Sequence, residues 1–204
     1  MSPVMTVPAS HMDLYRAKVG APEFVDVPPA RFLMIDGHGD PNTSSAFAQA
    51  VQTLYSGAYT IKFALKKAGG PDERVAPLEG LWWGGEAVDF AASSKDDWDW
   101  TMMIRIPDAA TDELVAGALT GAAAKKPDLA FDRARVEQFA EGLAAQVMYV
   151  GPYAEEGPAI AALHAFIAEH DYRRAGKHHE IYLGDPRRAD PHRLKTVIRQ
   201  PAER

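Results

Sequence analysis

The order of predicted elements repeats along the chain, and this repeat restricts the possible folds more than any other feature. The first half reads as a strand (FLMIDG), a glycine turn, a helix and two strands (LEGLWW and WTMMIRIP). The second half gives a strand (QVMYVG), a Gly-Pro turn, a helix and two strands (HHEIYL and TVIRQP). Both halves are therefore β-α-β-β, with Glu79 and Glu180 in matching strands. We expect an α+β fold in which pseudo-twofold units form an antiparallel sheet with helices on one face.

The helix signals agree with this order. Apolar residues from Phe47 to Leu65 recur at helical spacing, and Gly69-Gly70-Pro71 ends that helix. Thr111 to Lys126 predicts a second, peripheral helix, and 155–158 opens a third. We predict a flexible N-terminal segment over residues 1–23 and a single domain over 24–204, with halves of about 24–126 and 127–204.

Charge and composition exclude several function classes. The formal net charge of −6 argues against a nucleic-acid-binding surface, which needs a basic patch. The chain has no cysteine, so it has no disulfide or thiol nucleophile, and we expect a cytoplasmic protein. No apolar run is long enough to span a membrane, so we expect no membrane partner. The sequence does not indicate an oligomeric state.

The strand KHHEIYL carries the candidate site. Strand alternation places His178, Glu180 and Tyr182 on one face and Ile181 and Leu183 on the other, which we take as the core face. A carboxylate in a half-buried strand is unusual because burying it unpaired is costly. The alternative is that Glu180 is a solvated carboxylate on an exposed rim. We favour a site on the helix-free face or in the groove between the halves, where apolar surroundings would raise the pKa of Glu180 and the Tyr182 hydroxyl would partly offset this.

Aromatic side chains suit flat, partly cationic ligands through stacking and cation–π contacts. The candidate ligand-binding residues are Trp82, Trp83, Met103, Tyr149, Tyr153 and His178. Adjacent strand residues face opposite ways, so one of Trp82 and Trp83 belongs to the core and the other to the cleft, and the sequence does not say which. Trp98 and Trp100 alternate with Met102 and Ile104, and we interpret them as core residues.

Other chemistries lack their signatures. Only His178 and Glu180 converge within HHE, and two ligands make a poor zinc site, so we expect no metal and no cofactor. The segment GHGDPN lacks the GK[ST] ending of a P-loop, and no serine lies in a GxSxG setting. We interpret Glu155 and Glu156 as charges that compensate a helix dipole, with Glu155 also near enough to reach the cleft.

Four segments together resemble a known family. MIDGHGDPN, LEGLWWGGE, QVMYVGPYAEEGP and HHEIYLGDPRRADPHRLKTVIRQP look like the stand-alone GyrI-like small-molecule-binding proteins, with the resemblance extending from about Phe24 to Pro201. The resemblance implies a duplicated fold with a central cleft for bulky apolar, aromatic or cationic molecules, similar to the effector-binding domains of multidrug-sensing regulators. Glu180 matches the family's key cleft carboxylate. Some stand-alone members hydrolyse the cyclopropane of DNA-alkylating antibiotics, which implies a role in genotoxin resistance.

Three function classes stay open from the sequence. In the first, the protein is a hydrolase of cyclopropanoid electrophiles, with Glu180 as general base and Tyr182 positioning water or ligand as the catalytic pair. In the second, it sequesters or senses drugs, and Glu180 is the counter-charge to a cation. In the third, it is a gyrase-inhibitor-type protein-interaction module. The fold alone does not separate these classes.

Overall fold

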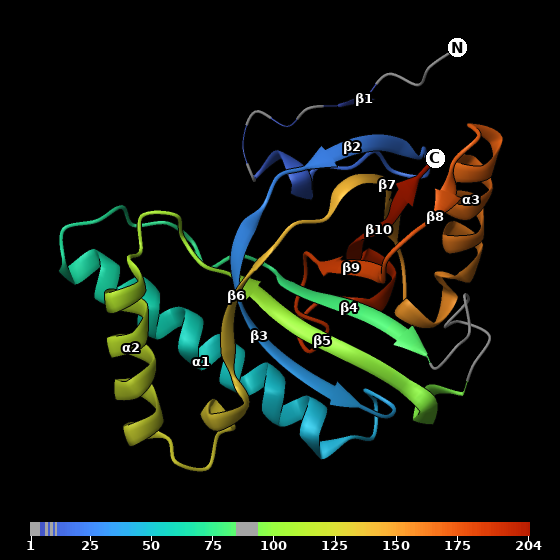
Figure 1. Cartoon of the computed structure of the whole chain (residues 1–204). Coiled ribbons are helices and arrows are strands. Elements are labelled where there is room, and N and C mark those ends of the chain that lie inside the picture. The colour runs from blue at the N-terminus through green and yellow to red at the C-terminus, as the bar shows by residue number, and fades with distance from the viewer. Residues whose placement is uncertain (1–4, 7, 9, 11, 85–93) are drawn as a thin grey trace. The chain divides into compact units, whose positions relative to one another are not determined.

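The structure, a computed structural model, describes residues 5, 6, 8, 10, 12–84 and 94–204 (Figure 1). The chain divides into two compact units. Unit 1 contains residues 1–29, 81–83 and 140–204, and unit 2 contains residues 30–80 and 84–139. Each unit packs α-helix against mainly antiparallel strands, which confirms the predicted α+β class.

Unit 2 is built on a helix-covered sheet. Its elements are β3 (Ala30–His38), α1 (Ser45–Lys67), β4 (Leu78–Gly84, of which residues 81–83 belong to unit 1), η3 (Lys95–Asp97), β5 (Trp98–Arg105), α2 (Asp112–Lys125), η4 (Phe131–Arg133) and β6 (Arg135–Phe139). The strand order is β4-β5-β3-β6, and α1 packs against α2, β3 and β5. Ser44 and Thr111 cap α1 and α2 by accepting hydrogen bonds from backbone N–H groups, as the sequence predicts for Thr111.

Trp100 belongs to the core of unit 2, as predicted. Its side chain is fully buried, and its ring packs edge-on against Phe47 of α1. A Cβ atom at Gly37 would overlap the Trp100 ring, so only glycine allows this close approach. The pairing of β3 with β5 therefore depends on a Trp–Gly contact at this point.

Unit 1 contains the remaining elements. They are β1 (Met5–Thr6), η1 (Asp13–Tyr15), β2 (Glu23–Val27), β7 (Gly142–Val150), η5 (Tyr153–Glu155), α3 (Gly157–Glu169), β8 (Arg173–Arg174), β9 (His178–Tyr182), η6 (Pro191–Arg193) and β10 (Lys195–Glu203). The strand order is β1-β2-β7-β10-β9, and β8 pairs with the end of β10. Asp190 caps η6 with Pro191 at its first position, as is typical of a helix start.

The predicted repeat is confirmed in the order and pairing of elements. In unit 2, the strand before the helix (β3) pairs antiparallel with the last strand (β5), and the third strand (β4) flanks the last. In unit 1, β7 pairs with β10, and β9 flanks β10 in the same way. The units differ from the predicted halves in three strands: unit 1 includes β2, which pairs with β7, and residues 81–83 of β4, and unit 2 includes β6, which pairs with β3.

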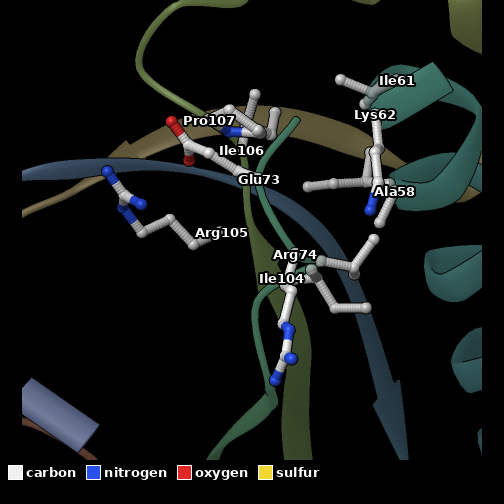
Figure 2. Close-up of a pocket in the computed structure, with 11 residues that line it drawn as sticks. Ala58, Ile61, Lys62, Glu73, Arg74, Ile104, Arg105, Ile106 and Pro107 are labelled. Carbon is white, nitrogen blue, oxygen red and sulfur yellow. The ribbon is translucent and has the colours of Figure 1, made fainter. Parts of the chain in front are cut away.

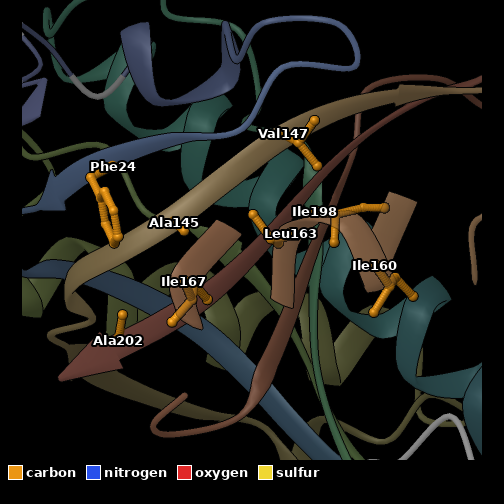
Figure 3. Close-up of a cluster of buried hydrophobic side chains, with 8 residues drawn as sticks. All are labelled: Phe24, Ala145, Val147, Ile160, Leu163, Ile167, Ile198 and Ala202. Carbon is orange, nitrogen blue, oxygen red and sulfur yellow. The ribbon is translucent and has the colours of Figure 1, made fainter. Parts of the chain in front are cut away.

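Helix α3 covers one face of the unit 1 sheet (Figure 3). Leu163 and Ile167 lie over side chains of β2, β7 and β10, and Ile160 lies beside Ile198. The cluster consists of Phe24, Ala145, Val147, Ile160, Leu163, Ile167, Ile198 and Ala202. Directly paired strand residues share a face, so this register defines which side chains of β9 lie on the α3 side.

The opposite face of this sheet is covered by the N-terminal segment. Leu14 and Ala17 are buried there, in contact with side chains of β2, β7, β9 and β10. Backbone hydrogen bonds link residues 18 and 20 to Met148 of β7. This differs from the flexible segment that we expected over residues 1–23, because burial of Leu14 and pairing with β7 order its second half. The part of that expectation for residues 1–4, 7, 9 and 11 lies outside the described residues.

Among the residues described here, no helix combines the length and hydropathy that a membrane span requires.

Candidate functional site

Glu180 is a buried side chain of β9 on the face that α3 covers. It is 6% exposed and pairs with Ile198, a member of the α3 cluster. The alternative interpretation as a solvated rim carboxylate is therefore wrong. The expectation of a helix-free face is also wrong for Glu180, because the register with β10 turns His178, Glu180 and Tyr182 toward the α3 side.

Three side chains hydrogen bond to the Glu180 carboxylate. The Tyr182 hydroxyl donates to Oε2 at 2.7 Å. His178 Nε2 lies 3.2 Å from Oε1 and donates to it, since an ionised carboxylate can only accept. The side chain of Glu156 supplies the third hydrogen bond. The indole Nε1 of Trp82 donates to the Tyr182 hydroxyl at 3.0 Å, so the network extends to a second aromatic residue.

These hydrogen bonds decide the charge of Glu180. Burial raises the pKa of Glu180, but the hydrogen bonds from His178, Tyr182 and Glu156 and the charge of His178 together lower it below its ordinary value. The raised pKa that we predicted is therefore wrong, because the desolvated carboxylate has more donors than the sequence revealed. Burial and the adjacent Glu180 charge raise the pKa of Tyr182 well above its ordinary value, so Tyr182 keeps the proton that it donates.

Glu156 is the residue that sequence reasoning missed. We interpreted it as a charge at a helix start, and it does lie at the N-terminal end of α3, but its side chain reaches Glu180. Glu156 therefore lies close enough to Glu180 to share a hydrogen bond, and two carboxyl groups share one only when one of them carries a proton. Glu155, which we expected to reach the cleft, is exposed. The only signal in the sequence was the Glu-Glu-Gly-Pro helix start itself.

Two further tyrosines lie around this network. The Tyr153 ring packs edge-on against the Tyr182 ring, with 5.5 Å between centroids. Tyr149 lies on the same sheet face in β7, and its hydroxyl donates to the carbonyl oxygen of Pro152 at 3.0 Å. The chain reaches Pro152 through Gly151, which has a φ of +152° and whose Cβ position would lie 2.5 Å from the Tyr149 hydroxyl oxygen. Only glycine fits this turn into the site.

The structure separates the two tryptophans. Trp82 is buried and hydrogen bonds to Tyr182, so it belongs to the Glu180 network. Trp83 is half-buried, and Lys177 Nζ lies 3.2 Å from its ring centroid in a cation–π contact. Met103, the remaining candidate, is fully buried in β5 of unit 2 opposite Met34, and its grouping with Glu180 stays a prediction.

The described residues form no metal centre, and a small pocket lies away from Glu180. In the part of the chain that the structure describes, no three His, Asp or Glu side chains form a group that could hold a metal ion. A pocket in unit 2 lies between α1, residues 73–75 and the end of β5 (Figure 2). It encloses about 10 Å³, roughly the space of one water molecule, and no predicted site residue lines it.

A second buried charged cluster lies on the opposite face of the same sheet. His179 Nδ1 and Arg199 Nη1 each lie 3.0 Å from the Glu141 carboxylate. Arg199 also donates to the Gln146 side chain and to the carbonyl oxygen of Leu14. Burial raises the pKa of Glu141, but His179 and Arg199 lower it to about 2 overall. No sequence pattern indicated this cluster, because Glu141, His179 and Arg199 lie far apart along the chain.

Comparisons with known proteins identify a family and several solved structures with the same fold. The model for the GyrI-like small molecule binding domain matches residues 20–202. An uncharacterized conserved protein from Listeria innocua is 40% identical, with a TM-score of 0.86 over 95% of this chain and 97% of that chain. A hydrolase from Listeria innocua is 39% identical, with a TM-score of 0.81 over 94% and 96% of the two chains.

More distant structures agree in fold alone. The C-terminal domain of EcmrR is 13% identical, with a TM-score of 0.59 over 90% of this chain and 98% of that domain. No curated protein matches the chain.

Proposed function

Since the chain belongs to the GyrI-like small-molecule-binding family, we propose that it binds bulky aromatic or cationic small molecules beside Glu180. The observation that carries this proposal is the buried, ionised Glu180 carboxylate held among aromatic side chains. A carboxylate with a lowered pKa stays charged at neutral pH and is a fixed counter-charge for a cation. Aromatic rings nearby add stacking and cation–π contacts, which favour flat, positively charged ligands.

A second candidate function is hydrolysis of electrophilic small molecules, including cyclopropane-containing genotoxins. Two observations favour it. The Listeria innocua hydrolase is 39% identical over nearly the whole chain. The Glu156 side chain also hydrogen bonds to Glu180, and we propose that Glu156 carries the shared proton, so that the pair supplies both a proton donor and a proton acceptor.

The proposed reaction adds one water molecule to the substrate. Glu180 takes a proton from the water, whose oxygen forms a bond to the electrophilic carbon of the ring. The strained C–C bond breaks, and its electron pair passes to the leaving carbon, which receives the proton of Glu156. Tyr182 holds the carboxylate in place through its hydrogen bond to Oε2. The lowered pKa makes Glu180 a weaker base than a carboxylate with an ordinary value, so this chemistry requires an activated electrophile.

The first prediction tests both functions with Glu180→Gln. This change keeps the shape of the side chain and removes its charge. For binding, we expect the affinity for aromatic cations to fall about tenfold or more, while neutral aromatic ligands bind nearly as before. For hydrolysis, we expect turnover of a cyclopropane-containing alkylating agent to fall roughly 10²–10⁴-fold. Quenching of tryptophan fluorescence measures binding, and product formation measures turnover.

The matched control is Glu79→Gln, which changes the buried carboxylate at the corresponding strand of unit 2. It should leave the affinity for aromatic cations unchanged. If Glu180→Gln binds cations and turns over substrate like the unsubstituted protein, the site is not at Glu180. If cation affinity falls but no electrophile is turned over by the unsubstituted protein, the protein binds ligands without hydrolysing them.

A further inference from the structure

Thr196 of β10 carries a hydroxyl group that no group in the described part of the chain satisfies. The residue is fully buried, and its Oγ1 atom has no hydrogen-bond partner among the described residues. A buried polar group without a partner is destabilising, and nearly all such groups in folded proteins are hydrogen bonded. An orphaned hydroxyl of this kind is therefore an indication of a partner that comes from outside the chain.

The position of Thr196 relates it directly to the Glu180 network. It pairs with Tyr149 of β7 on one side and with Tyr182 of β9 on the other, so its side chain lies on the same face between the two tyrosines. Glu180 is its diagonal neighbour, and diagonal neighbours of a sheet lie about 7–8 Å apart. A single bicyclic aromatic ligand spans this distance.

The hydroxyl groups of the two flanking tyrosines already donate their protons in hydrogen bonds. Tyr149 donates to the carbonyl oxygen of Pro152 at 3.0 Å, and Tyr182 donates to Glu180 at 2.7 Å. Tyr182 also accepts from Trp82, so its oxygen is engaged as well. Thr196 is thus the hydroxyl of this row that keeps both its proton and its acceptor capacity for a further group.

We propose that Thr196 is a specificity-determining residue, which hydrogen bonds to an uncharged polar group, a hydroxyl or carbonyl, on an aromatic ligand whose cationic part lies at Glu180. This inference rests on the proposed binding function and adds the substrate class to it. Glu180 selects for positive charge, the surrounding rings select for aromaticity, and Thr196 selects among aromatic cations for those with an oxygen substituent at the right distance. Such selection is effective because an unpaired buried hydroxyl penalises ligands that lack the matching group.

The test compares N-methylquinolinium with the set of its monohydroxy positional isomers, which share charge and ring system. In the unsubstituted protein, at least one isomer should bind more tightly than N-methylquinolinium. Thr196→Val, which has nearly the same shape without the hydroxyl, should weaken that isomer about fivefold and leave N-methylquinolinium unchanged. Thr196→Ser, which keeps the hydroxyl, should retain the preference.

The ligand-free protein provides a second readout. Because Thr196→Val removes an unsatisfied group, its melting temperature should be unchanged or higher. A clear drop in melting temperature would mean that the hydroxyl already has a partner, such as a structural water, and would overturn the assignment. Equal effects of Thr196→Val on all ring isomers and on N-methylquinolinium would overturn it as well.

The same measurements distinguish failure of the proposed binding function from failure of the Thr196 assignment. If N-methylquinolinium itself shows no affinity that depends on Glu180, the cation site is wrong, and the assignment of Thr196 is overturned with it. If the affinity depends on Glu180 but no isomer depends on Thr196, binding at Glu180 stands and only the assignment of Thr196 is wrong.

Discussion

Glu180 owes its chemistry to its neighbours. A buried carboxylate without donors would be neutral at physiological pH, because desolvation disfavours its charged form. Here His178, Tyr182 and Glu156 supply donors, and the group is ionised although it is only 6% exposed. The same donors restrain the side chain, so the carboxylate has the fixed position and charge that the proposed binding function requires.

The second prediction concerns Glu156, which we propose as the protonated partner of Glu180. Glu156→Gln keeps a donor for the carboxylate but removes the transferable proton, so we expect turnover of an electrophilic substrate to fall roughly 10²-fold or more. Affinity for aromatic cations should change by less than about threefold, since Glu180 stays ionised. Steady-state kinetics should show the loss in kcat rather than in KM.

The adjacent Glu155 offers a matched control for Glu156. Its side chain is exposed, so Glu155→Gln makes the same substitution at the same helix start without touching the Glu180 pair. Turnover by this variant should remain unchanged. Equal losses in both variants would mean that the negative charge near the α3 N-terminus matters, and that Glu156 is not a proton donor.

Alternation within one strand was sufficient to predict part of the hydrogen-bond network around Glu180. It grouped His178, Glu180 and Tyr182 correctly, because a period of two is a local property of β9. It did not find Glu156, whose side-chain direction depends on how the chain turns into α3. It also gave the wrong direction for the pKa of Glu180, because the number of donors around a group is a property of the folded chain.

At the scale of elements, α3 connects the core of unit 1 to the Glu180 network. One side of the helix packs on β2, β7 and β10 (Figure 3). The residue before its first turn, Glu156, hydrogen bonds to Glu180. Its packing therefore fixes the position of Glu156. Loss of that packing should weaken both the stability of the protein and the carboxyl pair.

The third prediction tests the packing of α3. Leu163 is fully buried in the cluster, so Leu163→Ala should lower the free energy of unfolding by about 2–5 kcal/mol through lost burial and the cavity left behind. Urea denaturation measures this change. The control variant is Phe63→Ala on α1, which removes an exposed side chain and should lower the free energy of unfolding by less than about 1 kcal/mol. A similar small loss for Leu163→Ala would mean that α3 contributes little to the core.

The elements themselves were largely predictable. Helix spacing, capping residues and Gly-Pro stops are local signals, and they gave the three helices and the repeated β-α-β-β order correctly. The partners of β2 and β6 were not predictable, because pairing between strands more than a hundred residues apart leaves no periodic signal. The same limit explains why the N-terminal segment was expected to be loose although Leu14 is buried.

At the scale of the whole molecule, the Glu141 cluster makes stability depend on pH. The pKa of Glu141 is about 2 in the folded protein, against an ordinary value of 4.5. A lowered folded pKa stabilises the native state above the unfolded value and ceases to do so as pH falls through the folded value. The buried ion pairs should therefore contribute about 3 kcal/mol above pH 5, and this contribution should be lost between about pH 4.5 and pH 2.

The fourth prediction isolates this contribution with Glu141→Gln. The variant should be less stable than the unsubstituted protein at pH 7, because His179 and Arg199 lose their buried counter-charge. The difference between the two proteins should shrink as the pH falls from 4.5 toward 2. Urea denaturation at a series of pH values measures it. A difference that stays constant with pH would show that Glu141 does not stay ionised in the folded state.

The contact between Arg199 and the N-terminal segment is made by a backbone carbonyl, that of Leu14, and not by a side chain. Every amino acid carries such a carbonyl, so this hydrogen bond constrains the path of the backbone. The side chain at position 14 is constrained only by packing. Substitutions that keep position 14 apolar should therefore leave the anchor intact. Removing the segment would instead leave a guanidinium group inside the sheet with one acceptor fewer. The first residues of the chain thus complete the solvation of a charge that belongs to its last strand.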